Sequence, residues 1–254
     1  MRALTKKVAI ITGASSGIGE AAARLFASEG ASLVIVARRQ AELTRVLSGI
    51  ETLGGQAVAI AGDVSEEATA KRAVNAALMT FGGLDIAFNN AGTLGAMGPT
   101  VDITAHQWRE TVDTNLTSAF FAAKHQIPAM LQRGAGSVIF TSTFVGYTVG
   151  FPGAAAYAAS KAGLVGLTQA LAAEFGPRSV RVNALLPGGT DTPMAARMNG
   201  TPEALAQVAS LHALKRIAMP EELAQAALFL ASDAASFMTG TAMLVDGGVS
   251  INRT

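Results

Sequence analysis

The chain has 254 residues, of which 50% are hydrophobic and 15% charged, with 27 glycines and a formal net charge of +1 at pH 7. This composition excludes a disordered chain, and the lack of a lysine or arginine block excludes an electrostatic footprint for nucleic acid or an anionic membrane surface. The absence of cysteine excludes disulfides and thiolate metal sites, and His106, His125 and His212 lack the spacing of metal ligands.

In chain order, short apolar runs alternate with longer segments that have alanine- and leucine-rich faces. The runs predicted as strands are Val8–Ile11, Leu33–Val36, Ala57–Ala61, Ile86–Phe88, Val138–Phe140, Val180–Ala184 and Ala242–Val245. The segments predicted as helices are roughly 17–29, 40–53, 66–81, 104–132, 155–175 and 220–231. Strands joined by helical crossovers run parallel, and near-continuous apolar strands need helices on both faces. We therefore expect an α/β protein with a doubly wound, seven-stranded parallel sheet and a ligand site at the carboxyl ends of its strands.

A glycine-rich turn, Thr12–Gly19, directly follows the first predicted strand and opens the first predicted helix. Gly13 permits a tight turn, Gly17 lets the backbone approach a phosphate, and Gly19 lets the helix pack on the sheet. Free N–H groups at a helix start attract a pyrophosphate, to which serine hydroxyls add donors. The residues predicted to bind it are Gly13, Ser15, Ser16, Gly17, Ile18 and Gly19. The alternative is a glycine-rich turn that binds nothing.

Tyr157 and Lys161 lie four residues apart in a predicted helix, so that their side chains share one face. A free tyrosine hydroxyl has a pKa of about 10 and is a poor acid or base near neutrality. An adjacent ammonium favours the phenolate, so we expect Lys161 to lower the pKa of Tyr157. The pair predicts a centre for proton transfer.

The glycine spacing and four further motifs resemble the short-chain dehydrogenase/reductase family over almost the whole chain. The matching segments are Thr12–Gly19, Asn89-Asn90-Ala91-Gly92, Asn115 in Asp-Thr-Asn-Leu, Tyr157 with Lys161, and Pro187-Gly188 followed by Thr192. The resemblance implies a single NAD(P)-binding Rossmann domain over residues 1–254, with a substrate-loop insertion at about 190–213. It extends equally to 3-oxoacyl-carrier-protein reductases and to sugar or alcohol dehydrogenases.

The resemblance also implies hydride transfer between a nicotinamide and a carbonyl or secondary alcohol. In that reaction Tyr157 is the acid or base, Lys161 tunes it and bonds the nicotinamide ribose, and Asn115 supports a water chain that resupplies protons. The further cofactor contacts that the resemblance implies are Asn90, Ala91, Gly92, Pro187, Gly188, Thr190 and Thr192.

A fourth catalytic group, a hydroxyl after the fifth strand, is ambiguous. Relatives carry a serine there, but this chain reads Thr141-Ser142-Thr143. Counting from Gly136 and from Gly146 favours Thr143, whereas residue type favours Ser142. Threonine offers the same donor and acceptor as serine, but its methyl group narrows a pocket.

The end of the second strand indicates the cofactor. An acidic residue there bonds the adenosine ribose of NAD, but this chain has Ala37, followed by Arg38 and Arg39. Forked cations suit a 2′-phosphate, so NADP is favoured over NAD. By resemblance, Asp63 and Val64 contact the adenine, although Asp63 also suits a helix N-cap.

The sequence constrains the choice of substrate and the oligomeric state less than it constrains the cofactor. Met97, Phe151, Met194 and Met198 lie in segments expected over the cleft and suit an uncharged ketone or acyl chain, or merely fill core gaps. Asp246-Gly247-Gly248 resembles a segment through which relatives pair, which implies a homotetramer or homodimer. No apolar run reaches the roughly 20 residues of a membrane span, so we expect no membrane partner and a cytoplasmic protein.

Three other functions share parts of this pattern. A non-catalytic NADP(H)-sensing protein keeps the glycine turn without needing Tyr157 and Lys161. An NAD-linked sugar or alcohol dehydrogenase keeps every motif except the Arg38 site. An epimerase or dehydratase with transient hydride transfer also shares the Tyr–Lys pair, but such enzymes usually carry a longer carboxyl-terminal domain.

Overall fold

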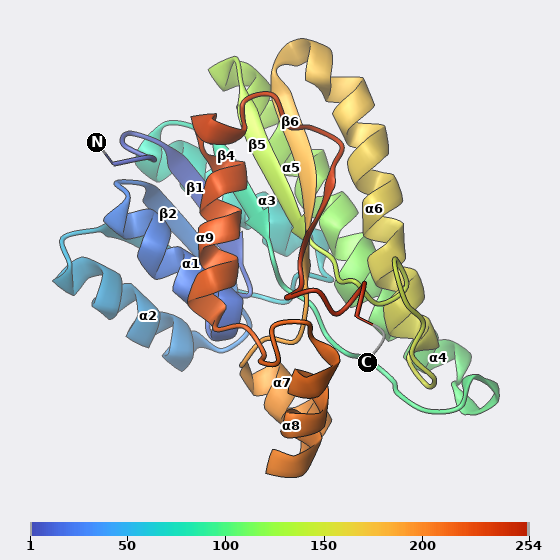
Figure 1. Ribbon diagram of the computed structural model, residues 1–254. Helices are drawn as coiled ribbons and strands as arrows, with labels where there is room; N and C mark the ends of the chain where they lie inside the picture. The colour runs from blue at the N-terminus through green and yellow to red at the C-terminus, as the bar shows by residue number, and fades with distance from the viewer. Residues whose placement is uncertain (1, 253–254) are drawn as a thin grey trace.

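The computed structural model describes residues 2–252, which contain one seven-stranded parallel sheet in the order β3-β2-β1-β4-β5-β6-β7 (Figure 1). Its strands are β1 (Val8–Thr12), β2 (Ser32–Ala37), β3 (Gln56–Ala61), β4 (Ile86–Asn89), β5 (Gly136–Thr141), β6 (Val180–Pro187) and β7 (Ala242–Val245). The order reverses between β1 and β4, which makes a doubly wound, Rossmann-like sheet. All seven predicted strands are confirmed.

The strands are mostly apolar because both faces of the sheet are covered. Ile11 and Ile35 pack in one hydrophobic cluster, whereas Ile10 and Val34, their neighbours in the chain, pack in a second cluster. Successive side chains of a strand point to opposite faces, so β1 and β2 contribute to both cores.

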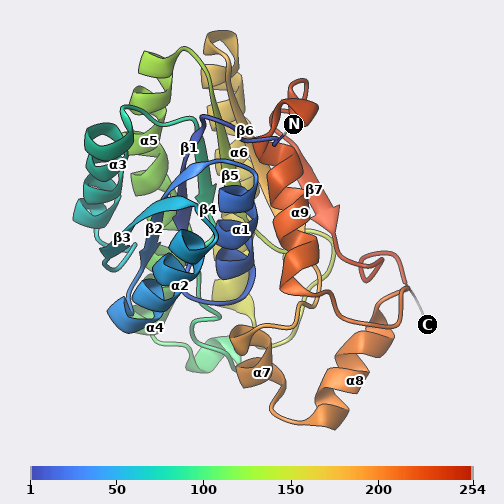
Figure 2. The ribbon, with the colours of Figure 1, turned by 90° about the vertical axis from the view of Figure 1, so that its left-hand side faces the viewer.

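Helices cover the sheet in two layers (Figures 1 and 2). One layer consists of α1 (Gly17–Ser28), α2 (Gln40–Thr52) and α9 (Pro220–Ala231), and the other of α3 (Glu67–Phe81), α5 (Ser118–Arg133) and α6 (Ala155–Phe175). Both layers leave the carboxyl ends of the strands open, where the connecting segments gather. No helix in the described part of the chain is long and apolar enough to cross a bilayer.

The segment 104–132, predicted as one helix, is divided. Helix α4 (Ala105–Val112) begins at a capping box between Thr104 and Gln107, and a π-helical turn (Asp113–Thr117) separates it from α5. A π turn widens the helix by one residue and changes the direction of its side chains. Here the turn carries Asn115, whose buried side chain bonds groups outside the helix.

The segment expected as an insertion, 190–213, contains α7 (Pro193–Asn199) and α8 (Pro202–Leu211). Thr192 and Thr201 each cap a helix whose first residue is proline. Threonine at the N-cap followed by proline is a helix-start signal that the sequence already contained. Figure 2 shows both helices projecting beyond the carboxyl ends of the strands.

Candidate active site

A cleft of about 760 Å³ lies at the carboxyl ends of the strands. Every sequence-predicted catalytic or cofactor residue lines it except Gly19 and Asn115. Most of these residues come from the segments that follow six of the strands, and Tyr157 and Lys161 come from α6, so only the tertiary structure brings them together. The cleft runs from Arg38 and Asp63 at one end, past Tyr157 and Lys161, to an apolar pocket under α7 and α8.

The glycine turn adopts conformations that side chains would prevent. Gly13 has φ +69° and Gly17 has φ +56°, both in the left-handed region. A Cβ on Gly17 would lie 3.0 Å from Cγ2 of Thr192, and one on Gly19 would collide with the carbonyl oxygen of Gly13. Gly19 therefore serves packing, as its motif position predicts, and Gly17 brings the turn close to the loop after β6.

The hydroxyl of Thr12 ties the first and fourth strands together at the floor of the cleft. Its Oγ1 accepts the N–H groups of Asn90 and Ala91, each at 3.0 Å. Asn90 and Ala91 follow the end of β4, and the two bonds give their backbone N–H groups an acceptor. The bonds also hold the Asn-Ala-Gly segment against the glycine turn.

The end of β2 presents two arginines beside the glycine turn. Arg39 Nη2 lies 3.5 Å from Ser15 Oγ, and Arg38 lies 3.9 Å from the Asp63 carboxylate with its side chain 74% exposed. Burial tends to raise the pKa of Asp63, but hydrogen bonds from Ser65 and the charge of Arg38 outweigh it and lower that pKa. Asp63 does not cap a helix, because it bonds Ser65 at 2.9 and 2.8 Å while α3 begins at Glu67.

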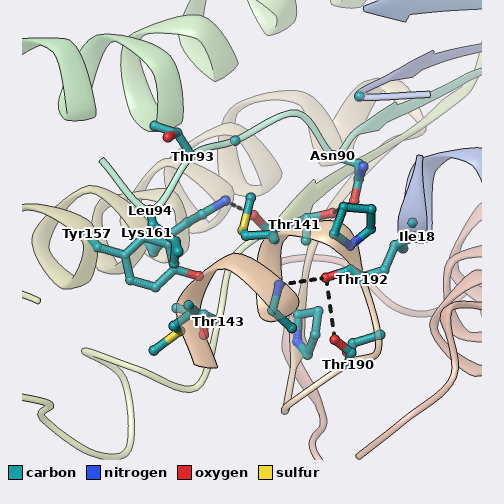
Figure 3. Close-up of a pocket in the computed structure, with 18 of the residues that line it drawn as sticks. Ile18, Asn90, Thr93, Leu94, Thr141, Thr143, Tyr157, Lys161, Thr190 and Thr192 are labelled. Carbon is teal, nitrogen blue, oxygen red and sulfur yellow. Dashed lines mark hydrogen bonds between the residues drawn. The ribbon is translucent and has the colours of Figure 1, made fainter. Parts of the chain in front are cut away.

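Lys161 is buried on α6, where its Nζ donates to the carbonyl oxygen of Thr141 at 2.6 Å (Figure 3). Burial lowers its pKa to about 8. Burial also raises the pKa of Tyr157, against a smaller lowering effect of its hydrogen bond with Thr143. The predicted lowering of the Tyr157 pKa by Lys161 is therefore wrong for this structure, since desolvation of the phenolate dominates.

The two hydroxyls after β5 have different partners. Ser142 Oγ donates to the carbonyl oxygen of Lys161 at 2.7 Å, so it is committed to the backbone of α6. Thr143 bonds the Tyr157 side chain, and its Oγ1 also accepts the N–H of Val145 at 3.3 Å. Figure 3 shows Thr143 and Tyr157 on the same side of the cleft. The geometry thus pairs Thr143 rather than Ser142 with the tyrosine.

Asn115 lies beneath the cleft and clamps the segment that follows β4. Its Oδ1 accepts from Thr93 N at 2.8 Å, and its Nδ2 donates to Thr93 O at 2.9 Å and to Ser160 Oγ at 3.0 Å. A Cβ on Gly92 would lie 3.1 Å from Asn115 Oδ1 and 3.0 Å from Lys161 Nζ. Glycine at position 92 therefore leaves room for both groups. The motifs predicted neither Thr93 nor Ser160 as partners.

The remaining half of the cleft is apolar. Met97, Phe151, Met194 and Met198 all line it, together with Phe144, whose ring meets that of Phe151 edge-on at 5.8 Å. The charged side chains of the lining are Arg38, Arg39, Asp63, Lys161 and Arg197. Of these, only Arg197 belongs to the apolar half, and its Nε donates to the carbonyl oxygen of Pro193.

Comparison with known proteins places the chain among dehydrogenases and reductases. A family model described as enoyl-(acyl carrier protein) reductase matches residues 13–250. Cyclohexanol dehydrogenase of Acinetobacter sp. (strain SE19) is 39% identical over 95% of this chain and 94% of its own. The crystal structure of levodione reductase has a TM-score of 0.94 and 33% identity, covering 98% of this chain and all of that one. A structure from Beutenbergia cavernae, described as an NAD(P)-dependent gluconate 5-dehydrogenase with bound NADP at low occupancy, has a TM-score of 0.92, 35% identity and coverage of 98% and 99%.

Proposed function

Because this chain belongs to the short-chain dehydrogenase/reductase family, whose members bind NAD(P), we propose that it is an NADP(H)-linked carbonyl reductase or alcohol dehydrogenase. The reaction is the transfer of a hydride between the nicotinamide and a carbonyl or secondary-alcohol carbon. The observation that carries this proposal is the convergence of Tyr157, Thr143 and Lys161 in one cleft with the glycine turn.

The residues present fit a dinucleotide. Gly13 and Gly17 supply the left-handed backbone angles of the turn, and the start of α1 offers N–H groups for a pyrophosphate. Asp63 and Val64 are proposed to hold the adenine, and the residues proposed along the nicotinamide half are Asn90, Ala91, Gly92, Pro187, Gly188, Thr190 and Thr192. The whole chain, 1–254, is proposed to form one such domain, with α7 and α8 as its substrate-side insertion.

The preference for NADP rests on three neighbouring residues. Ala37 has no carboxylate to repel a 2′-phosphate, and Arg38 and Arg39 bring two guanidinium groups to the mouth of the cleft. Arg39 already approaches Ser15 on the phosphate-binding turn. Guanidinium groups bind phosphate with paired hydrogen bonds, so we propose that this cluster holds the 2′-phosphate.

In the reductive direction, Tyr157 donates its proton to the carbonyl oxygen. Because burial raises the pKa of Tyr157, the phenol stays protonated at neutral pH and is ready to donate. Thr143 orients that hydroxyl and the substrate oxygen, whereas Ser142 only supports α6. Lys161 supplies positive charge below pH 8 and bonds the nicotinamide ribose, and Asn115 positions α6 and the segment after β4.

The substrate is proposed to be an uncharged ketone or secondary alcohol whose carbon skeleton is apolar. The apolar half of the cleft offers methionine and phenylalanine side chains and no acidic group. Methionines adapt to irregular apolar shapes. The relative that acts on cyclohexanol supports a ring of that size as the first compound to test.

Assembly into a homodimer or homotetramer is proposed through the edge of the sheet. Strand β7 is an edge strand, and Phe229, Phe237 and Leu244 around it are 39%, 103% and 39% exposed. Exposed apolar side chains beside an unpaired strand edge favour association.

The test is separate titration of the purified protein with NADPH and NADH, followed by turnover assays with cyclohexanone, open-chain ketones and 3-oxoacyl thioesters. We expect the protein to bind NADPH more tightly than NADH and to oxidise NADPH when cyclohexanone is present. Tight cofactor binding without turnover of any compound would favour the non-catalytic sensor. Absence of binding by both cofactors would contradict the proposal.

A further inference from the structure

His212 is buried directly after α8, with both ring nitrogens bonded to the backbone. It is 2% exposed, its Nε2 accepts the N–H of Gly189 at 3.0 Å, and its Nδ1 lies 2.8 Å from the carbonyl oxygen of Val208. An amide N–H only donates and a carbonyl only accepts, so the ring is neutral with its proton on Nδ1. Any other protonation state would lose one of the two bonds.

Gly189 belongs to the loop after β6 that is proposed to hold the nicotinamide half of the cofactor. Its N–H is held by His212 on one side, and its carbonyl accepts from Ala218 N at 2.8 Å on the other. A Cβ on Gly189 would lie 2.9 Å from Cε1 of His212, so the ring packs against the glycine itself. The peptide groups on both sides of Gly189 are therefore held, the first by the ring and the second, which joins Gly189 to Thr190, by Ala218.

The segment 193–211, which comprises α7 and α8 and is here named the lid, is anchored to that same loop at both ends. At its start, Thr192 Oγ1 accepts from Ala195 N at 3.2 Å and lies 3.4 Å from the carbonyl oxygen of Thr190. At its end stands His212. No residue of α8 is buried, and Figure 1 shows α7 and α8 projecting away from the sheet. Besides these two anchors, Asn252 Nδ2 donates to the carbonyl oxygen of Leu211 at 3.0 Å, so the end of the lid is also bonded to the carboxyl-terminal segment.

The same lid lines the apolar half of the cleft. Met194 and Met198 on α7, and Val208 and Leu211 on α8, all face it. The acceptor of the Nδ1 proton is Val208 itself, so the imidazole links a residue of the substrate pocket directly to the cofactor loop.

We propose that His212 is a positioning residue that couples the lid to the cofactor loop through the Gly189 hydrogen bond. This inference rests on the proposed function, since it assigns the loop after β6 to the cofactor. A fixed Gly189 peptide presents Thr190 and Thr192 to the cofactor without an ordering cost at binding. The coupling is reciprocal: a cofactor that orders the loop also orders the lid over the substrate.

Two amide variants separate this role from simple packing. In His212→Gln the side-chain oxygen reaches the place of Nε2 and keeps an acceptor for Gly189. In His212→Asn the amide reaches only the place of Nδ1, so the Val208 bond is retained and the Gly189 bond is lost. Hydrogen exchange of the free protein, read in fragments over 186–192 and 193–211, reports the coupling directly, and fluorescence titration with NADPH reports its effect on affinity.

We expect His212→Asn to speed exchange in both fragments and to weaken NADPH binding, each by about tenfold, as expected for one lost buried hydrogen bond. His212→Gln should stay within about threefold of the unaltered protein in both measurements. Unchanged exchange in His212→Asn, or equal losses in both variants, would overturn the proposal. If the unaltered protein does not bind NADPH, the proposed function fails separately, and exchange alone decides whether the lid and loop are coupled.

Discussion

The ammonium of Lys161, a buried side chain, donates to the carbonyl oxygen of Thr141 at the end of β5, 2.6 Å away. Burial lowers its pKa to about 8, so this lysine changes charge just above neutral pH. A group that the proposed mechanism uses in its charged form is therefore held at a cost in stability, and that cost can be measured.

Replacing Lys161 with methionine should stabilise the protein more at pH 7 than at pH 10.5. Below pH 8 the lysine is charged in both the folded and unfolded states, so its desolvation penalty is fully present. Above the unfolded-state pKa of about 10.4 it is neutral in both states and the penalty disappears. The stability advantage of Lys161→Met should shrink by roughly 3 kcal/mol over this range.

Urea denaturation at a series of pH values measures this difference in the free energy of unfolding, with Lys71→Met on the exposed side of α3 as control. A constant difference between Lys161→Met and the unaltered protein would contradict the burial argument.

Replacing Tyr157 with phenylalanine should lower kcat at least a hundredfold and leave NADPH affinity within about threefold, because only the transferable proton is removed. The matched control is Tyr147→Phe, since Tyr147 is the other tyrosine of the chain and is 49% exposed. Steady-state kinetics and fluorescence titration give the two readouts. Retained turnover in Tyr157→Phe would remove the tyrosine from the mechanism.

The hydroxyl after β5 is tested by three variants. Thr143→Val keeps the shape of the side chain but removes the hydroxyl that bonds Tyr157, so kcat should fall about tenfold to a hundredfold. Thr143→Ser keeps the hydroxyl and should retain most of kcat. Ser142→Ala removes the bond to the Lys161 carbonyl, which should cost about 1 kcal/mol of stability with little effect on kcat. The reverse pattern, with Ser142→Ala inactive and Thr143→Val active, would assign the role to Ser142.

Changing Arg38 to aspartate should move the preference from NADPH toward NADH. An acid at the end of β2 repels a 2′-phosphate and bonds the free ribose hydroxyl of NAD. We expect the ratio of kcat/KM for NADPH over NADH to fall at least tenfold, as expected from the loss of one charged contact. Arg109→Asp on the exposed side of α4, outside the cleft, is the control for net charge. If both variants change the ratio equally, Arg38 has no specific part in cofactor choice.

The sequence by itself determined the sheet and the glycine turn, because both are encoded locally. An apolar run such as Val8–Ile11 forms a strand that must be buried on both faces of the sheet. A turn such as Thr12–Gly19 needs glycines because its own backbone has positive φ angles. The grouping of nearly all predicted site residues in one cleft follows from the same regularity, since parallel strands end at one edge of the sheet.

Only the tertiary structure decided which side chains meet within that cleft. Whether Ser142 or Thr143 faces Tyr157 depends on the path of the chain after β5, and the pKa of Tyr157 depends on how deeply the fold buries its side chain. The π turn at Asn115 and the bond between His212 and Gly189 join segments with no common motif. Such contacts depend on distances between packed elements, which residue type and spacing along the chain do not specify.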